Sequence, residues 1–274
     1  MTTAKSKPAR TYALGGELNV NRIGYGAMRL TGQPGNFGPY ADWEGGKALL
    51  RRAVDLGVTF LDTARAYGPQ WNEKLIAEAL HPYEPGVVVA TKGGIDKFSP
   101  TQLVRDAGRT ALRQQVEHAL GNLRVERIDL FQLHWVDPNT PIEVSVAALD
   151  EMRREGKIRL IGLCNTDRDQ LDRALAVVPI ASVQNRYNIA EREHDALIDY
   201  TASKGIAFIP YGPLSAHPMK QGAPLAAERG AKTKFTPAQE SLAALLRRSP
   251  NVIVIPGTTS ISHLEENVGT WAAA

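Results

Sequence analysis

The chain has 274 residues, of which 43% are hydrophobic and 22% charged, with a formal net charge of +3. This composition is typical of a globular protein with a sizeable core, and it contains neither the apolar runs of a membrane protein nor the long basic runs of a nucleic-acid-binding one. The single cysteine, Cys164, excludes an internal disulfide, and the N-terminal residues lack the apolar centre of a secretion signal, so we expect a cytoplasmic protein.

Strand and helix patterns alternate along the chain. The segment from Tyr12 to Val20 resembles a β-hairpin around Gly15-Gly16. Eight apolar strands are predicted after it, at residues 21–28, 58–62, 87–92, 128–133, 158–164, around 183, 206–210 and 252–255. Helices are predicted at residues 43–56, 73–80, 99–123, 140–155, 166–177, 194–204 and 236–248, and from 262 nearly to the C-terminus.

Several predicted helices begin with capping signals. Ser99-Pro100-Thr101-Gln102, Thr140-Pro141-Ile142-Glu143 and Thr236-Pro237-Ala238-Gln239 each offer a hydroxyl cap, a proline at the first helical position and Glu or Gln two residues later. Thr166-Asp167-Arg168-Asp169 is predicted to open another helix, and Ser262 is predicted to cap the last one.

Eight strands that alternate with helices predict an α/β fold, a (β/α)8 TIM barrel with an N-terminal β-hairpin, in one domain over residues 1–274. The alternative is an open doubly wound sheet, which requires a glycine fingerprint after the first strand. Gly24 and Gly26 supply two of its glycines, but Arg29 stands where the third belongs. The barrel is therefore favoured.

Six of the predicted strands end on a polar side chain. These residues are Asp62, Lys92, His134, Asn165, Gln184 and Tyr211. In a barrel the carboxyl ends of all strands meet at one mouth, where active sites lie. We expect the Asp62 carboxylate and the Lys92 ammonium to pair, because two buried charges are tolerated only together.

Tyr67 follows Asp62 in the loop above the predicted mouth. A lysine nearby stabilises a phenolate, so we expect the pKa of Tyr67 to fall from its usual value of about 10 toward neutrality. Such a phenol could protonate a carbonyl oxygen, and His134 could donate a second hydrogen bond to that oxygen. A hydride must then come from a cofactor. Asn165 and Gln184 suit a carboxamide such as that of nicotinamide, Tyr211 offers a stacking face, and residues 255–260 suit phosphate.

The motifs GYGAMRL, FLDTARAYG, TKGG, LHW, GKIRLIGLCN, VQNRYN, IPYGPL and IPGTTSISHLEEN together resemble the aldo-keto reductase family over residues 24–267. The IPGTTS loop and the NFGP insert are similar to a bacterial branch that includes pyridoxal reductases (pyridoxine 4-dehydrogenases). The resemblance implies carbonyl reduction, or alcohol oxidation in reverse, with NADP(H), and pyridoxal is a candidate substrate.

The resemblance also implies roles for individual residues. The catalytic tetrad would be Asp62, Tyr67, Lys92 and His134, with Tyr67 as proton donor. The cofactor-binding residues would be Ala27, Met28, Asp62, Cys164, Asn165, Gln184, Tyr211, Gly212, Leu214, Gly257, Thr258, Thr259, Ser260, His263, Glu266 and Asn267.

The chain departs from the family pattern at the cofactor site. Many members have lysine at the position of Gly257 and arginine at that of His263, and both bind the 2′-phosphate of NADP. Thr258, Ser260 and His263 could serve instead, so NADP(H) is predicted and NAD(H) stays as the alternative. The family often has serine where Cys164 stands.

Other functions remain as alternatives. A non-enzymatic nicotinamide-binding barrel, such as a channel subunit or regulatory protein, would keep the same fold. A phosphate-binding isomerase would need a carboxylate base at the mouth. No metal site is predicted, because His81, His118, His194 and His217 lack partners at ligand spacing.

The predicted partner is a small carbonyl compound bound by a monomer, without nucleic acid or membrane. Trp43, Trp71, Trp135 and Phe37 are candidates for lining the substrate pocket, Trp135 above all, whereas Trp43 is expected rather to pack with its helix. The loops at 31–40 and 213–234 are both rich in glycine and proline, and the second is also long. Such loops are often functional.

Overall fold

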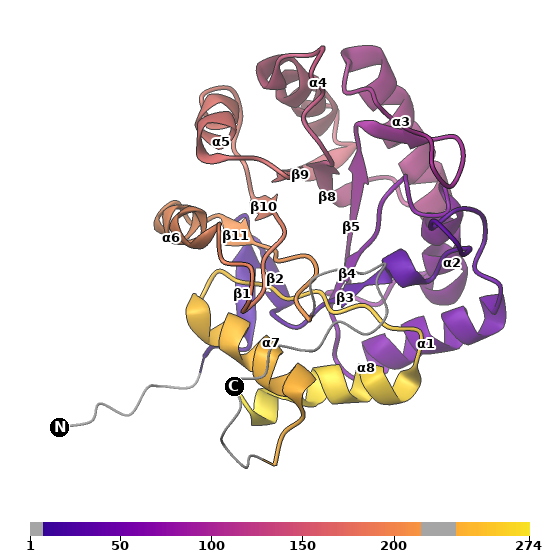
Figure 1. Cartoon of the computed structure of the whole chain (residues 1–274). Helices are drawn as coiled ribbons and strands as arrows, with labels where there is room; N and C mark the ends of the chain where they lie inside the picture. The colour runs from indigo at the N-terminus through magenta and orange to yellow at the C-terminus, as the bar shows by residue number, and fades with distance from the viewer. Residues whose placement is uncertain (1–7, 215–233) are drawn as a thin grey trace.

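A parallel sheet at the centre of the molecule curls into a ring that the helices surround (Figure 1). The structure is a computed structural model that describes residues 8–214 and 234–274. The strands of the ring are β3 (Tyr25–Gly26), β4 (Phe60–Asp62), β5 (Val88–Gly93), β8 (Ile128–Leu133), β9 (Ile158–Cys164), β10 (Ser182–Gln184) and β11 (Ala207–Phe208). They pair in the order β11-β10-β9-β8-β5-β4-β3, and every pairing is parallel.

Residues 252–255 close the ring between its two end strands. Val252 forms a parallel bridge to Phe208 of β11, and Val254 forms one to Ile23, just before β3. The ring therefore has eight members, and the predicted (β/α)8 barrel is confirmed. Its first and last strands are shorter than predicted. The predicted strand at 21–28 is reduced to β3 because the chain turns into a 3-10 helix, η1 (Ala27–Arg29).

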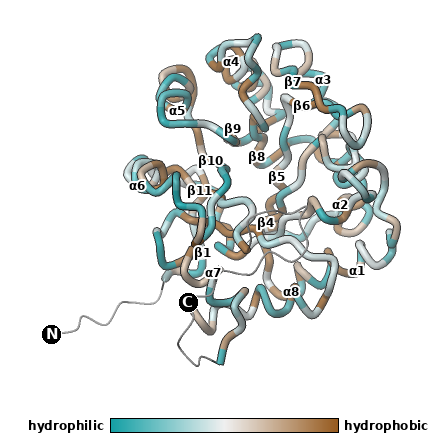
Figure 2. The backbone as a smooth tube through the Cα atoms, in the orientation of Figure 1, coloured by the Kyte–Doolittle hydropathy of each residue, from teal (hydrophilic) through white to brown (hydrophobic). Residues whose placement is uncertain are grey.

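The helices form the outer ring. In the part of the chain that the structure describes they are α1 (Trp43–Asp55), α2 (Trp71–Leu80), α3 (Arg109–Leu123), α4 (Ile142–Arg154), α5 (Arg168–Leu175), α6 (Asp195–Ser203), α7 (Pro237–Arg248) and α8 (Ile261–Val268), which a second 3-10 helix, η2 (Gly269–Ala272), continues. Hydrophobic and hydrophilic segments alternate along them (Figure 2), as expected for helices with one face on the sheet. None of these helices has the length and apolar character needed to cross a bilayer.

The predicted N-terminal hairpin is present, as β1 (Thr11–Leu14) paired with β2 (Leu18–Asn21). Leu14 and Val20 are fully buried and belong to the same apolar cluster as Phe60, Ala207 and other residues of the barrel strands. The hairpin thus seals the barrel at the end where the strands begin. This leaves the carboxyl ends of the strands as the open mouth.

The helix predicted from Ser99 begins ten residues later. Residues 95–105 form a second hairpin instead, β6 (Ile95–Lys97) paired with β7 (Leu103–Arg105), and α3 starts at Arg109. The Ser99 hydroxyl accepts hydrogen bonds from the backbone N–H groups of Thr101 and Gln102, at 3.3 and 3.0 Å. The same local bonds that cap a helix close the tip of this hairpin, which is why the signal misled.

Two predicted helix starts are confirmed, and both carry a capping box. Asp167 accepts from the backbone N–H of Gln170, and Thr236 does so from that of Gln239; both glutamines bond back to the cap residue. The cap predicted at Thr140 was wrong. Thr140 donates to Asp137 instead, and α4 starts only after Pro141.

The last helix is capped by Ser260 rather than by Ser262. The Ser260 side chain accepts from the backbone N–H of His263, and the helix begins at Ile261. The residues just before α8 therefore lie at its N-terminus, where backbone N–H groups are available to an anion.

A fully buried arginine holds the closing segment in place. Arg22 is 0% exposed, and its guanidinium donates to the carbonyl oxygens of Val252, Leu246, Ser249 and Ala9 at 2.8, 2.8, 2.6 and 2.9 Å. Burial lowers its pKa to about 10. Among the residues described, its charge is balanced by carbonyl dipoles and not by a carboxylate.

We expect Arg22→Met to lower the free energy of unfolding by at least about 3 kcal/mol, because it leaves several buried carbonyl groups without donors. Urea denaturation would measure the loss. Arg109→Met is the matched control, since Arg109 forms an exposed ion pair with Glu151 and its removal is expected to cost less than about 1 kcal/mol. Equal losses in the two variants would contradict the role given to Arg22.

Candidate active site

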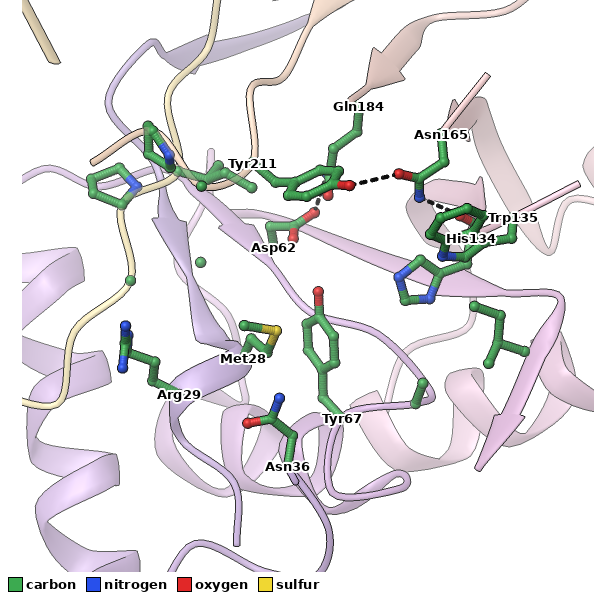
Figure 3. Close-up of a pocket in the computed structure, with 18 of the residues that line it drawn as sticks. Met28, Arg29, Asn36, Asp62, Tyr67, His134, Trp135, Asn165, Gln184 and Tyr211 are labelled. Carbon is green, nitrogen blue, oxygen red and sulfur yellow. Dashed lines mark hydrogen bonds between the residues drawn. The ribbon is translucent and has the colours of Figure 1, made fainter. Parts of the chain in front are cut away.

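A cavity of about 350 Å³ opens at the carboxyl ends of the barrel strands (Figure 3). Most of the strands contribute to its wall through the residue at or just after their end. Of the residues predicted from the sequence, Met28, Asp62, Tyr67, His134, Asn165, Gln184, Tyr211, Gly212, Leu214 and Gly257 line it.

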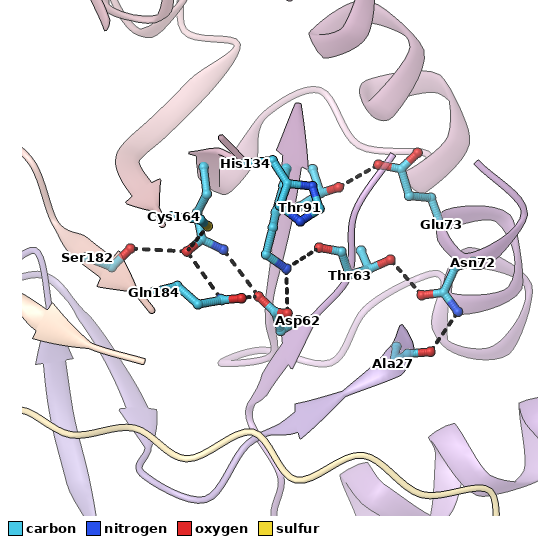
Figure 4. Close-up of polar contacts among 12 residues, drawn as sticks. Ala27, Asp62, Thr63, Asn72, Glu73, Thr91, His134, Cys164, Ser182 and Gln184 are labelled. Carbon is cyan, nitrogen blue, oxygen red and sulfur yellow. Dashed lines mark hydrogen bonds and ion pairs between the residues drawn. The ribbon is translucent and has the colours of Figure 1, made fainter. Parts of the chain in front are cut away.

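An ion pair lies beneath this cavity. The Lys92 ammonium is 2.5 Å from Asp62 Oδ2, and these residues are 0% and 2% exposed. They come from adjacent strands, β5 and β4, so their pairing follows from the order of the sheet. Lys92 also donates to the carbonyl oxygen of Thr63 at 2.9 Å (Figure 4). The predicted pairing is confirmed.

The second oxygen of Asp62 is also occupied. The side-chain amides of Gln132 and Gln184 donate to Asp62 Oδ1 at 3.2 and 2.9 Å. Gln132 in turn accepts from Cys164 Sγ at 3.7 Å and from Ser182 Oγ at 3.5 Å. With both oxygens engaged, Asp62 is suited to anchor Lys92 and poorly suited to act as the base of an isomerase.

The ion pair keeps Lys92 charged. Burial by itself acts to lower the pKa of Lys92, but the Asp62 carboxylate and the nearby Tyr67 outweigh it, so the pKa is raised above its ordinary value. A positive charge is therefore held in a fixed place under the cavity at neutral pH.

Tyr67 lies on the cavity wall above Lys92. Its ring centroid is 5.1 Å from Lys92 Nζ and 6.0 Å from the His134 ring, which it meets edge-on. Burial raises the pKa of Tyr67 to about 12, although Lys92 acts to lower it. The prediction that this pKa falls toward neutrality was wrong. The loss of hydration raises the pKa more than the Lys92 ammonium lowers it, because Asp62 already neutralises that ammonium. The phenol is protonated at neutral pH.

His134 completes the group at the mouth. Burial and the charge of Lys92 hold the pKa of His134 well below its ordinary range, so the imidazole is neutral. Its Nδ1 is buried and has no hydrogen-bond partner in the part of the chain that the structure describes. A neutral imidazole has one N–H, which can be donated to an oxygen in the cavity.

The wall formed after β9, β10 and β11 carries amides and an aromatic ring. Asn165 donates to the His134 carbonyl oxygen at 3.0 Å and accepts from the Tyr211 hydroxyl at 2.8 Å. Gln184 directs its N–H bonds to Asp62 and Gln132, so it can offer only its carbonyl oxygen to a ligand. A primary carboxamide, which both donates and accepts, fits this pair.

Two glycines bring the closing segment against the end of β3. A Cβ atom at Gly257 would lie 2.5 Å from the carbonyl oxygen of Gly26, and one at Gly26 would lie 2.7 Å from that of Ile255. The Tyr25 hydroxyl donates to the Thr258 carbonyl oxygen at 2.6 Å. The cavity therefore reaches the loop that precedes α8, and a side chain in place of either glycine would collide with this backbone.

The remaining predicted residues lie outside the cavity wall. Lys92 and Cys164 lie beneath it, Ala27 is buried, and the others lie before or on α8, where Glu266 is hydrogen-bonded to Thr236. Those others are Thr258, Thr259, Ser260, His263, Glu266 and Asn267.

Three of the four aromatic candidates do not line the cavity, among them Trp43, for which helix packing was expected. Only Trp135 does; Trp43 and Trp71 pack edge-to-face with ring centroids 6.1 Å apart, and Phe37 is absent from the wall. Most of the predicted loop at 213–234, including His217, lies outside the described residues.

Several lining residues were not predicted. They are Gly26, Arg29, Asn36, Ala66, Ile95, Lys97, Leu103 and Pro213. Ile255 and Pro256, which also line the cavity, belong to the segment 255–260 that was predicted to suit phosphate. Leu103 was missed because the residues from Ser99 onward were predicted to start a helix, and Lys97 was missed because no strand was predicted between residues 92 and 99. No local signal in the sequence separates the two structures.

Known proteins share this architecture and much of this sequence. Residues 22–274 match the profile of the Aldo/keto reductase family. The chain is 40% identical over 266 residues to the pyridoxine 4-dehydrogenase of Escherichia coli (strain K12), covering 95% of this chain and 92% of that enzyme. It is 40% identical over 254 residues to the uncharacterized oxidoreductase C215.11c of Schizosaccharomyces pombe, covering 92% and 82%. An aldo-keto reductase from Klebsiella pneumoniae in complex with NADPH superposes with a TM-score of 0.80 at 26% identity, covering 96% and 89%.

The buried ion pair can be tested by its coupling. We expect Asp62→Asn and Lys92→Met to lower the free energy of unfolding by about 3–5 kcal/mol each, because each leaves an uncompensated buried charge. The double variant should lose clearly less than the sum of the two, as measured by urea denaturation. Strictly additive losses would mean that the two charges do not stabilise each other.

Proposed function

The chain belongs to the aldo/keto reductase family, as its motifs indicated, and we propose that it reduces an aldehyde or ketone to an alcohol with NADP(H). The observation that supports this proposal most is the protonated phenol of Tyr67 on the cavity wall. The centroid of its ring lies 5.1 Å from the Lys92 ammonium. Tyr67 is the group we assign as proton donor. The reverse reaction, alcohol oxidation, uses the same groups.

Each residue of the group has one task in this reaction. When bound, the nicotinamide cofactor supplies the hydride that the carbonyl carbon accepts. Tyr67 holds a proton on its hydroxyl and transfers it to the carbonyl oxygen. Lys92 stabilises the phenolate that remains, and Asp62 keeps Lys92 charged and in place. His134 donates a hydrogen bond to the same oxygen and orients it.

Two parts of the cavity wall would hold the cofactor, the one that carries amide side chains and the one built by the two closely packed glycines. Asn165 and Gln184 fit the carboxamide, because together they can donate and accept. Tyr211 presents an aromatic face beside them. The tight approach of Gly26 and Gly257 keeps that part of the wall free of side chains, next to the N-terminus of α8, which suits phosphate groups.

NADP(H) is the proposed cofactor, supported by the NADPH complex of the structurally similar Klebsiella protein. The 2′-phosphate would be bound by Thr258, Ser260 and His263, which take the place of the lysine and arginine common in the family. Of these residues, Ser260 is half-buried just before α8 and His263 is exposed on its first turn, so a ligand can reach both.

Pyridoxal is a candidate substrate, because the similar Escherichia coli enzyme is a pyridoxine 4-dehydrogenase. A panel of aldehydes that includes pyridoxal, run with NADPH and with NADH, tests the proposal. We expect cofactor oxidation at 340 nm with at least one aldehyde, and a higher kcat/KM with NADPH. Binding of NADPH without any turnover would favour the alternative of a non-enzymatic nicotinamide-binding barrel.

We expect Tyr67→Phe to lower kcat for aldehyde reduction by at least about 100-fold, because the proton donor is lost while the ring stays. Binding of NADPH, followed by its fluorescence, should change by less than about threefold, since the phenol hydroxyl lies on the substrate side. Tyr83→Phe is the matched control, because Tyr83 bonds to the Leu123 carbonyl oxygen away from the cavity. A Tyr67→Phe enzyme that keeps the parent rate would refute the assignment.

A further inference from the structure

The hairpin of β6 and β7 forms the cavity wall opposite the proposed cofactor residues. It follows β5, which lies four positions from β11 in the closed ring. Ile95, Lys97 and Leu103 of the hairpin line the cavity. Trp135 lines it beside them, with the Arg105 guanidinium 4.4 Å from its ring centroid. This wall is therefore apolar and aromatic, with a cation in it.

Lys97 is only partly exposed and has an unusual set of contacts. Its ammonium donates to the carbonyl oxygens of Gly35 and Asn36, the latter at 3.5 Å. Within residues 8–214 and 234–274, no carboxylate forms an ion pair with it. The adjacent Asp96 is already bound by Arg65 at 2.5 Å. Burial lowers the pKa of Lys97, as expected for a cation that has lost water without gaining a counter-charge.

The charges around the cavity are unequal. Arg29 and Lys97 are the cationic residues of the wall in the described chain, and Asp62 is its only carboxylate there. Because the charge of Asp62 is neutralised by Lys92, no carboxylate among the described wall residues is left to balance Lys97. A negative group on the substrate would restore the balance near Lys97.

We infer that Lys97 is a specificity residue and that the preferred carbonyl substrate carries an anionic group, a carboxylate or a phosphate, on an apolar or aromatic body. The body lies against Ile95, Leu103 and Trp135, and the anion accepts a hydrogen bond from the Lys97 ammonium. This inference rests on the proposed carbonyl reductase function and names the substrate class for that site.

Lys97 also joins two loops, and this provides the competing explanation. The Asn36 carbonyl oxygen accepts from the backbone N–H of Gly68, next to Tyr67, so the lysine could serve only to order the wall. A purely structural lysine would affect anionic and neutral substrates alike. A lysine that binds the anion would affect the ratio of their kcat/KM values.

The test uses two pairs of aldehydes that differ in charge. One pair is 4-carboxybenzaldehyde and 4-methylbenzaldehyde, which tests a carboxylate as the anionic group. The other pair is pyridoxal 5′-phosphate and pyridoxal, which tests a phosphate. We expect the parent enzyme to favour the anionic member of at least one pair. Lys97→Met should lower the anionic-to-neutral ratio of kcat/KM by about tenfold, mainly through KM, as expected for one charged hydrogen bond.

Two further variants keep the inference falsifiable if Lys97→Met disturbs the wall. Lys97→Arg retains the charge and should retain the preference. Lys97→Glu should reverse it toward a cationic aldehyde such as 4-(trimethylammonio)benzaldehyde. Lys204→Met is the matched control, because Lys204 is an exposed lysine just after α6 that packs near Tyr200 outside the cavity.

Two results would overturn the inference. Equal losses for anionic and neutral aldehydes in Lys97→Met and Lys97→Glu would show that Lys97 only orders the wall. A parent enzyme that reduces the neutral aldehydes at least as well as the anionic ones would refute this substrate class and leave the proposed function standing. Reduction of no aldehyde at all would instead refute the proposed function.

Discussion

The ion pair between Lys92 and Asp62 is the interaction on which the rest of the site depends. Both side chains are almost completely withdrawn from water. Charges in such a place are tolerated only when they are paired and every remaining polar atom has a partner. Gln132 and Gln184 satisfy the second oxygen of Asp62, and the Thr63 carbonyl satisfies Lys92. The result is a positive charge fixed beneath the mouth of the barrel.

This arrangement places the proton and the charge on different residues. Tyr67 keeps its proton because burial disfavours a phenolate, and His134 stays neutral because burial and Lys92 disfavour an imidazolium. In the reaction proposed above, the ammonium would contribute little to the resting state and most when the phenol gives up its proton. An interaction that strengthens only as the reaction proceeds is the kind that accelerates it.

The two walls of the cavity differ in chemistry because different parts of the fold build them. The strand ends of β9, β10 and β11 carry amides and an aromatic ring at positions that the barrel holds rigidly. The opposite wall is a hairpin inserted between β5 and α3, with apolar side chains and the ammonium of Lys97. In barrels, loops of this kind vary without disturbing the sheet, so they set substrate choice.

The sequence by itself determined the barrel and the residues at its mouth. Apolar strands that end in Asp62, Lys92 and His134 carry that information, because parallel strands bring their carboxyl ends together whatever the loops do. Only the tertiary structure decided the pKa of Tyr67 and the position of Lys97. The first depends on burial by residues far apart in the chain, which no local pattern records. The second depends on the antiparallel pairing of β6 with β7. The sequence does not reveal this pairing, because the bonds that the Ser99 hydroxyl accepts from the backbone N–H groups of Thr101 and Gln102 are the same in a hairpin tip as at a helix start.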